Sequence, residues 1–178
     1  MEHRCIFAGF GGQGIVSMGT LLAYAGLFDR KQVTFFPSYG IAMRGGTANC
    51  TVVVADGEIA SPIVNDPGVV IAMNDPSFDC FQPMVAPGGL LLVNSSLIGR
   101  KAARKDIRAA YLPATGIALE KGDGRMANMA MLGGLIKLTN IVSLDAVEEA
   151  MRKTFSAKLQ KLIGRNREVL RSGFEKIA

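Results

Sequence analysis

Hydrophobic residues in this chain form two kinds of pattern, short continuous runs and longer stretches with a helical period. Continuous runs at 4–8, 69–73 and 90–93 predict strands, the last two covered on both faces. From Ile15 to Leu27 the apolar positions recur every three or four residues, which predicts a helix. Strands that alternate with helices predict an α/β fold, a Rossmann-like three-layer α/β/α sandwich around a mixed, mostly parallel sheet.

Turn and capping residues delimit the remaining elements. Strands are expected at 33–36 (ended by Pro37), 49–55 and 107–112, and helices at 114–121, 125–138, after Ser143, and over 157–171 with a break at Gly164. Asp56-Gly57 predicts a β-hairpin between 49–55 and 58–61, because both central residues of such a turn need a positive φ. We expect residues 1–178 to form one domain, whose basic helical tail from about 143 to 178 is its least anchored part.

Basic residues are concentrated in two places. The formal net charge is +5, yet the segment from Arg152 onward alone carries +6, which leaves −1 for residues 1–151. A second cluster lies at 100–108. No aromatic residue interleaves with that cluster and the chain has no Trp, so stacking on nucleic-acid bases has little support. We therefore expect the two basic clusters to be solvated faces of the protein or surfaces that steer an acidic protein partner.

Cysteine and histidine are too scarce for most metal or redox sites. Cys5, Cys50 and Cys80 are scattered without a C-x-x-C pair, and His3 is the one histidine. This disfavours disulfides, iron–sulfur clusters and zinc sites, so no metal ligand is predicted. No apolar stretch approaches the ~20 residues of a bilayer span, and the apolar run at the N-terminus is too short for a signal peptide. We expect no membrane contact and a cytoplasmic location.

A glycine loop at 9–14 follows the first strand and opens the first helix. It supplies Gly9, Gly11, Gly12, Gln13 and Gly14. Glycines let the backbone approach a phosphate closely and direct its amides, with the helix N-terminus, toward the negative charge. A dinucleotide site would also need an acidic residue after the second strand, where this chain has 36–38, Phe-Pro-Ser. A ligand-free tight turn is the other interpretation.

A second loop, 37–47, follows the second strand. Its candidate ligand-binding residues are Ser38, Tyr39, Arg44, Gly45, Gly46 and Thr47. Because both loops follow strands, they should emerge together at the carboxyl edge of the sheet. The arginine fork and the backbone amides suit a phosphate, a carboxylate or an acidic side chain of another protein. A salt bridge that pins the loop internally is the alternative role for Arg44.

Several catalytic patterns are absent. The sequence has no Ser-His-Asp or Cys-His set, no carboxylate pair beside an acid/base partner and no Walker lysine. Gly122-Asp123-Gly124 lacks the downstream element of a thiamine-binding motif. We therefore predict no catalytic residue, and a chain that does not perform difficult chemistry alone.

The two loops together resemble the gamma subunit of 2-oxoacid:ferredoxin oxidoreductases. The likeness continues nearly throughout the chain, at 47–51, 61–62, 72–74, 87–91, 94–96, 113–114 and 127–129. It is most similar to the stand-alone gamma subunit of the 2-oxoglutarate enzymes; pyruvate, branched-chain and indolepyruvate enzymes carry related chains. Many relatives have Pro-Glu where this chain has Ile41-Ala42, so any role of that carboxylate does not transfer.

The resemblance implies a complex that decarboxylates a 2-oxoacid, with 2-oxoglutarate expected, transfers the acyl group to coenzyme A and reduces ferredoxin. It implies the fold of domain III of pyruvate:ferredoxin oxidoreductase. Thiamine diphosphate, Mg and the iron–sulfur clusters would lie on alpha, beta or delta subunits, and this chain would border the coenzyme A path. The glycine loop and Arg44 would bind coenzyme A phosphates or shape the subunit interface. A stand-alone dinucleotide-binding reductase is the alternative.

Overall fold

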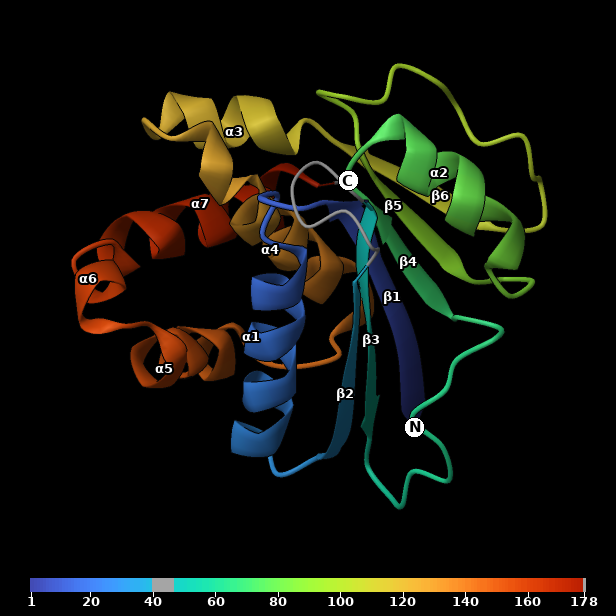
Figure 1. Cartoon of the computed structure of the whole chain (residues 1–178), viewed down its shortest axis with the longest axis horizontal. Helices are drawn as coiled ribbons and strands as arrows, with labels where there is room; N and C mark the ends of the chain where they lie inside the picture. The colour runs from blue at the N-terminus through green and yellow to red at the C-terminus, as the bar shows by residue number, and fades with distance from the viewer. Residues whose placement is uncertain (40–46, 178) are drawn as a thin grey trace.

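The computed structural model describes residues 1–39 and 47–177. Its strands are β1 (Glu2–Phe10), β2 (Gln32–Tyr39), β3 (Thr47–Ala55), β4 (Val69–Ala72), β5 (Leu90–Asn94) and β6 (Arg108–Leu112). They form one sheet in the order β2-β3-β1-β4-β5-β6 (Figure 1). β3 runs antiparallel to β1 and β2, whereas β1, β4, β5 and β6 are parallel. The predicted mixed, mostly parallel sheet is confirmed.

Helices cover the two faces of the sheet unequally. They are α1 (Ile15–Phe28), α2 (Asp75–Phe81), α3 (Ala114–Glu120), α4 (Ala127–Thr139), α5 (Leu144–Thr154), α6 (Ala157–Gln160) and α7 (Ile163–Lys176), with 3₁₀ turns η1 (Gln82–Met84) and η2 (Gly124–Met126). α1 and α4 pack on one face and α5 and α7 lie outside them, whereas α2 covers the other face (Figure 1). The predicted three layers are present, with a second tier of helices on one side. None of the described helices has the length and apolarity to cross a bilayer.

The two central parallel strands explain the continuous apolar runs. Every residue of β4 and β5 is buried. Val69 and Ile71 join the larger core cluster under α1 and α4, and Val70 and Ala72 join the smaller cluster that contains Phe78 of α2. A strand between two helical layers has no polar face, so its sequence shows no alternation.

The predicted hairpin at 49–61 is wrong. Residues 58–61 form no strand, because both edges of β3 are already paired, one with β1 and the other with β2. Asp56, which directly follows β3, instead forms an ion pair with the N-terminus. Its Oδ2 accepts a hydrogen bond from the N-terminal ammonium group at 2.7 Å. The antiparallel part of the sheet is therefore made by the insertion of β3 between β1 and β2.

Two other boundaries also differ from expectation. β2 continues through Pro37 to Tyr39, since it is an edge strand and proline's missing N–H is tolerated there. The break in the C-terminal helix comes at 161–162, so Gly164 lies inside the first turn of α7. In that first turn the N–H groups have no intrahelical partner, and a glycine is easily accommodated.

The expectation that the C-terminal tail is the least anchored part is wrong for α7. This helix crosses α4 at glycines: a Cβ on Gly133 would lie 2.0 Å from the carbonyl oxygen of Leu170, and one on Gly173 would lie 2.1 Å from that of Ala130. Val169 and Leu170 are fully buried in the same contact. Only glycine permits such a close backbone approach, so these two helices are tightly packed.

Candidate functional site at the carboxyl edge of the sheet

Both glycine-bearing loops leave the sheet at the same edge. In the strand register Phe10 pairs with Thr47, and Tyr39 pairs with Ala48. The start of β3 thus lies between the ends of β1 and β2, which are about 10 Å apart. The predicted convergence of the two loops is confirmed for the strand ends that carry them. Arg44, Gly45 and Gly46 lie outside the described residues, and the side chains of Tyr39 and Thr47 are likewise not described.

The backbone of the glycine loop uses conformations that favour glycine. Gly12 has φ 94° and Gly14 has φ 73°. Gly14 directly precedes α1, and its carbonyl accepts the N–H of Met18 at 2.9 Å. No side chain caps α1 and no acidic residue lies in its first turn. Gly11 and Gly12, which precede the N-terminus of α1, are exposed. The positive end of a helix dipole attracts anions.

Gln13 holds the loop in place. Its Oε1 accepts hydrogen bonds from the N–H of Phe10 at 2.7 Å and from Nδ2 of Asn74 at 2.8 Å. Its Nε2 donates to the carbonyl of Met73 at 3.4 Å. The side chain of Gln13 therefore connects the glycine loop to the end of β4 and positions the backbone amides around it.

Asn128 clamps the other end of the loop. It is 6% exposed, and its Nδ2 donates to the carbonyl of Gly14 at 3.2 Å. A Cβ on Gly14 would lie 2.3 Å from that nitrogen, so the residue must be glycine for two reasons, its positive φ and this contact. Sequence reasoning missed the structural role of both Asn74 and Asn128. They lie 61 and 114 residues from their partners in the loop, and no local pattern marks such distant contacts.

A small crevice lies beside the glycine loop. Its volume is about 210 Å³, and it is lined by Gly12, Gln13, Met73, Leu97, Thr115, Gly124, Arg125 and Ala127. It opens where the connection after β1 goes to one face of the sheet and the connection after β4 goes to the other. Open α/β sheets bind ligands at such a switch point.

The sheet order argues against a dinucleotide at this loop. The neighbour of β1 on the α1–β2 side is the antiparallel strand β3, which ends at Ala55 on the opposite edge of the sheet. β2 lies one strand further away and reaches this edge with the exposed residue Ser38. In a dinucleotide site, the ribose is held by an acidic side chain at the end of a parallel strand next to β1. Among the described residues, no acidic side chain occupies such a position on the α1–β2 side of β1.

The cysteines offer no nucleophile inside the fold. Cys5 and Cys50 are buried, and burial raises the pKa of both thiols to about 12. Both therefore stay protonated at neutral pH. Cys80 is exposed on α2. Within residues 1–39 and 47–177 no group of three His, Cys, Asp or Glu side chains could hold a metal ion.

Two of the five basic residues at 100–108, Arg100 and Arg104, form ion pairs with acidic side chains among the described residues. Arg100 pairs with Asp75 and Asp79 of α2, each at 2.9 Å. Arg104 pairs with Asp106 and also donates to three carbonyl oxygens, those of Gln82, Pro83 and Val85. The ammonium group of Lys101 lies 3.8 Å from the ring centre of Tyr111. This cluster thus fixes the segment against α2 and β6.

The C-terminal basic residues divide into two groups. Four form ion pairs: Arg167 and Arg171 with Glu148, Arg152 with Glu149, and Lys176 with Glu120. In the part of the chain that the structure describes, no acidic side chain lies within salt-bridge distance of the other four, Lys153, Lys158, Lys161 and Arg165. Among the C-terminal basic residues, those without an ion pair therefore lie where α5, α6 and α7 meet.

Comparison with known proteins gives matches along the chain. Residues 4–176 match the family model described as pyruvate ferredoxin/flavodoxin oxidoreductase. A ketoisovalerate oxidoreductase subunit VorA from Methanothermobacter marburgensis is 41% identical over 97% of this chain, which spans only 36% of that relative. A 2-oxoglutarate synthase subunit KorC from Methanocaldococcus jannaschii is 36% identical, and the match covers 85% of this chain and 82% of the relative.

Solved structures share the fold. A keto/oxoacid ferredoxin oxidoreductase gamma subunit from Geobacter sulfurreducens superposes with a TM-score of 0.86 at 28% identity, and the match covers 99% of this chain and 96% of that one. A 2-oxoglutarate:ferredoxin oxidoreductase from Magnetococcus marinus, with 2-oxoglutarate, coenzyme A and succinyl-CoA bound, superposes with a TM-score of 0.88 at 23% identity. That match covers 97% of this chain and 30% of the larger one.

Proposed function

Because the chain belongs to the pyruvate ferredoxin/flavodoxin oxidoreductase family, we propose that it serves as the gamma subunit of a 2-oxoacid:ferredoxin oxidoreductase. The complex would convert a 2-oxoacid to an acyl-CoA and reduce ferredoxin. The observation that carries this proposal is an almost end-to-end correspondence, in sequence with KorC and in structure with the Geobacter gamma subunit. Partial matches to longer chains alone would not define a separate subunit.

We propose 2-oxoglutarate as the substrate of that complex. The KorC relatives are 34–36% identical to this chain over most of their own length, whereas the VorA relatives contain it as about a third of a longer polypeptide. The common gamma subunits of pyruvate and ketoisovalerate enzymes also match over most of their own length, at the lower identity of 32%. Ketoisovalerate and pyruvate are the competing substrates, since related subunits belong to enzymes named for them. The contacts that select the 2-oxoacid would lie on other subunits, and a substrate assay of the complex decides among the three.

The proposed role of this chain is to shape the coenzyme A path. The glycine loop offers two exposed glycines, Gly11 and Gly12, and an uncapped helix N-terminus, and Gln13 and Asn128 hold the loop in place. The second loop begins at the same edge, and its Arg44 supplies a guanidinium group suited to phosphate. Thiamine diphosphate with Mg would supply decarboxylation chemistry, and iron–sulfur clusters electron transfer. We place these groups on the partner subunits: the alpha and beta chains and, in complexes that have one, a delta chain.

Purification of the tagged chain from its anaerobically grown host tests the subunit assignment. Thiamine-binding and iron–sulfur subunits should be recovered in near-equimolar amounts, identified by mass spectrometry. The purified complex should then reduce ferredoxin with 2-oxoglutarate and coenzyme A faster than with pyruvate or ketoisovalerate. Recovery of the chain alone, with bound NAD(P)H or FAD, would instead establish a stand-alone reductase.

An Arg44→Ala complex tests the coenzyme A path. Removal of a charge-assisted phosphate contact should raise the KM for coenzyme A by about tenfold. If Arg44 instead holds the interface, recovery of the other subunits should fall. The matched control is Arg108→Ala, an exposed arginine on β6. Unchanged KM together with unchanged assembly would contradict both forms of the proposal.

A further inference from the structure

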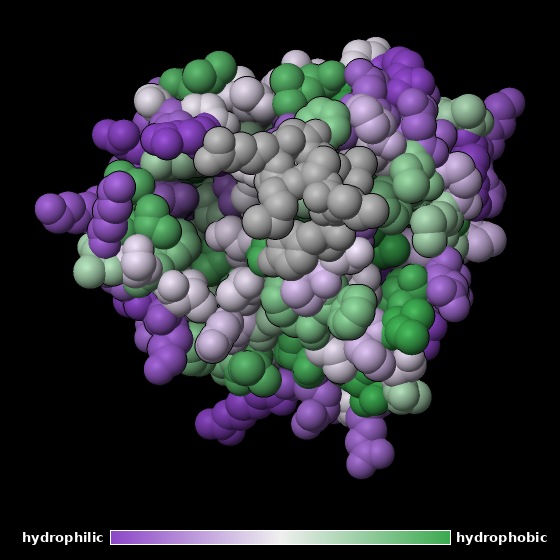
Figure 2. Space-filling view, in the orientation of Figure 1, coloured by the Kyte–Doolittle hydropathy of each residue, from purple (hydrophilic) through white to green (hydrophobic). Residues whose placement is uncertain are grey.

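The meeting point of α5, α6 and α7 borders a large open groove, which we call the corner groove. It has a volume of about 720 Å³ and lies between this corner, the start of α1 and the start of α4. Its apolar lining consists of Met126, Met129, Phe155, Leu159 and Leu162. Figure 2 shows a hollow beside α6 with hydrophobic atoms along it. Leu159 stands at the mouth, 42% exposed.

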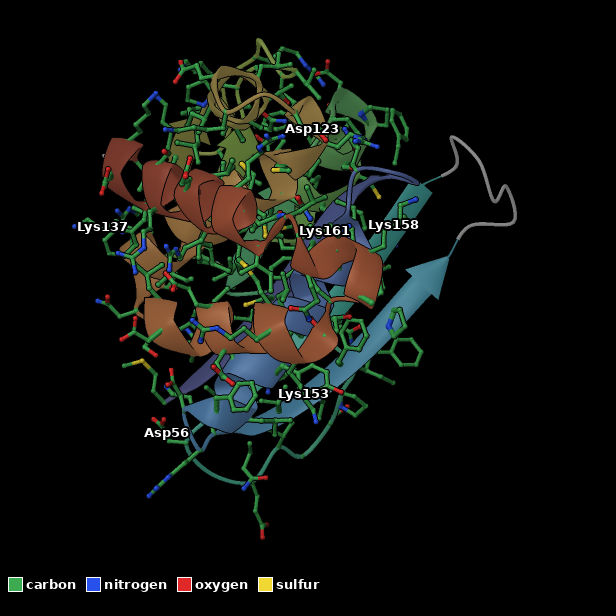
Figure 3. All side chains as sticks on the ribbon, turned by 90° about the vertical axis from the view of Figure 1, so that its left-hand side faces the viewer. Asp56, Asp123, Lys137, Lys153, Lys158 and Lys161 are labelled. Carbon is green, nitrogen blue, oxygen red and sulfur yellow. The ribbon has the colours of Figure 1, made fainter. Side chains whose placement is uncertain are left out.

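Positive charge surrounds this apolar lining. Lys158 and Lys161 line the groove and lie on the same corner of the molecule (Figure 3). The acidic residue in the lining, Asp123, is already engaged by Arg125, whose Nη2 lies 2.7 Å from its Oδ2. The two lysines have no acidic neighbour within salt-bridge distance in the described ranges 1–39 and 47–177. The groove is therefore positive overall.

Two further features of the wall bear on the occupant: the first favours negative charge and the second favours a polypeptide backbone. Gly14 and Ser17 bring the N-terminal end of α1 to the groove, and the first turn of that helix contains no acidic residue. Asn166, 8% exposed, donates its Nδ2 to the carbonyl of Leu162 at 2.9 Å. Its Oδ1 has no hydrogen-bond donor among the described residues, so it can accept a backbone N–H from an occupant.

We propose that the corner groove receives an acidic amphipathic segment of another polypeptide. The apolar side chains of that segment would pack on the methionines and leucines, and its carboxylates would pair with Lys158 and Lys161. Flexible methionine side chains adapt to such a segment, as in grooves that bind amphipathic helices. Because the groove is open at its mouth, it suits a segment that continues over the surface better than an enclosed small ligand.

The longer relatives support a polypeptide occupant. In the VorA relatives the matched domain is 36% of the polypeptide, and in the Magnetococcus enzyme it is 30%. In those proteins the domain therefore has further polypeptide attached to it, whose segments can cover its exposed faces. The choice of a subunit as the source of the acidic segment rests on the proposed function.

Photo-cross-linking in the assembled complex tests the occupant. Leu159 is replaced by a benzophenone amino acid, the complex is irradiated, and the linked peptide is sequenced by mass spectrometry. The expected product links residue 159 to a partner segment in which acidic and apolar residues recur at helical spacing. The control site is Leu119 of α3, which is 62% exposed and outside the groove lining. It should not give that product.

Charge reversal tests the electrostatic part. Lys158→Glu with Lys161→Glu should reduce the cross-link from residue 159 and weaken partner binding by at least about tenfold. The control, Lys105→Glu with Arg108→Glu, reverses as many exposed charges on the β6 side and should change neither. Circular dichroism of both double variants, with Lys158→Ala and Lys161→Ala as milder versions, checks that they fold.

Each failure has a distinct meaning. If the unmodified chain brings down no subunits, the proposed function is wrong. An intact complex that gives no cross-link from residue 159, or a cross-link to a segment without acidic residues, overturns the groove proposal alone. A small anionic molecule retained by the chain in native mass spectrometry, and lost on charge reversal, would likewise overturn it and assign the groove to a small ligand.

Discussion

The segment at 100–108 and the corner at 153–165 resemble each other in sequence, since both are rich in basic residues and poor in acidic ones. In the structure they differ. Arg100 and Arg104 bind acidic side chains and carbonyl groups of the chain itself, whereas Lys158 and Lys161 border an open groove. A dense run of positive charge thus identifies an interaction surface only once its internal partners are known.

The difference follows the chemistry of the two cations. A guanidinium group donates in several directions within one plane, so Arg104 can bind Asp106 and three carbonyl groups at once. An ammonium group is compact and strongly hydrated, and it remains in water unless an anion approaches. Arg100 and Arg104 therefore stabilise the chain, and Lys158 and Lys161 remain available to a partner.

The largest expected effect on stability concerns the contact between α4 and α7, which holds α7 in place at the corner. Gly173→Ala places a Cβ 2.1 Å from a backbone oxygen of α4, so α7 must shift, and we expect the free energy of unfolding to fall by about 3 kcal/mol or more. Gly164→Ala in the same helix meets nothing within 4 Å and should stabilise by up to about 1 kcal/mol. Urea denaturation measures both. Equal effects would mean that the α4–α7 crossing does not anchor the corner.

A smaller loss is expected for Arg104→Ala. Three carbonyl oxygens and Asp106 lose a donor, and the melting temperature should fall by several degrees, on the order of 5 °C. Arg104→Lys should retain only part of the stability that Arg104→Ala loses, because an ammonium group cannot reproduce the planar fork of the guanidinium group. Arg108→Ala, without an ion pair among the described residues, is the control.

The Arg104 contribution should also depend on pH. The hydrogen bond from Arg104 lowers the pKa of Asp106 below its ordinary value. The stabilisation is therefore fully present above the ordinary carboxyl pKa of about 4 and is lost as the pH falls through the lowered value. The difference in melting temperature between wild type and Arg104→Ala should shrink in acid. A constant difference down to about pH 2 would contradict the role of the ion pair.

The sequence predicted the local elements better than their partners. The apolar runs located β4 and β5, because the period of apolar positions is a local property. Both loops were placed at one edge because each directly follows a strand. The strand at 58–61 failed because the edges of β3 are taken by strands that lie elsewhere in the chain. Asn74 and Asn128, like the lining of the corner groove, depend on contacts between distant segments, which one sequence does not display.

Arg100→Ala should have a weaker effect than Arg104→Ala. Its ion pairs with Asp75 and Asp79 are exposed and screened by salt, so we expect a loss of about 1–2 °C in melting temperature at low ionic strength. The difference from wild type should disappear near 1 M salt, where the Debye length is about 3 Å. A loss as large as that of Arg104→Ala would mean that the 100–108 segment is held chiefly by α2.

The smallest expected effect on stability is that of Lys158→Ala with Lys161→Ala. Neither lysine has an acidic neighbour within salt-bridge distance in the described residues, so their removal should change the melting temperature by less than about 2 °C. Thermal denaturation of the isolated chain measures this, with Lys105→Ala as the control. A clear stabilisation would mean that the lysines repel neighbouring charges, an energetic cost that binding of an acidic segment would relieve. A large destabilisation would mean that the lysines support the fold, and the contrast between the two basic regions would then fail.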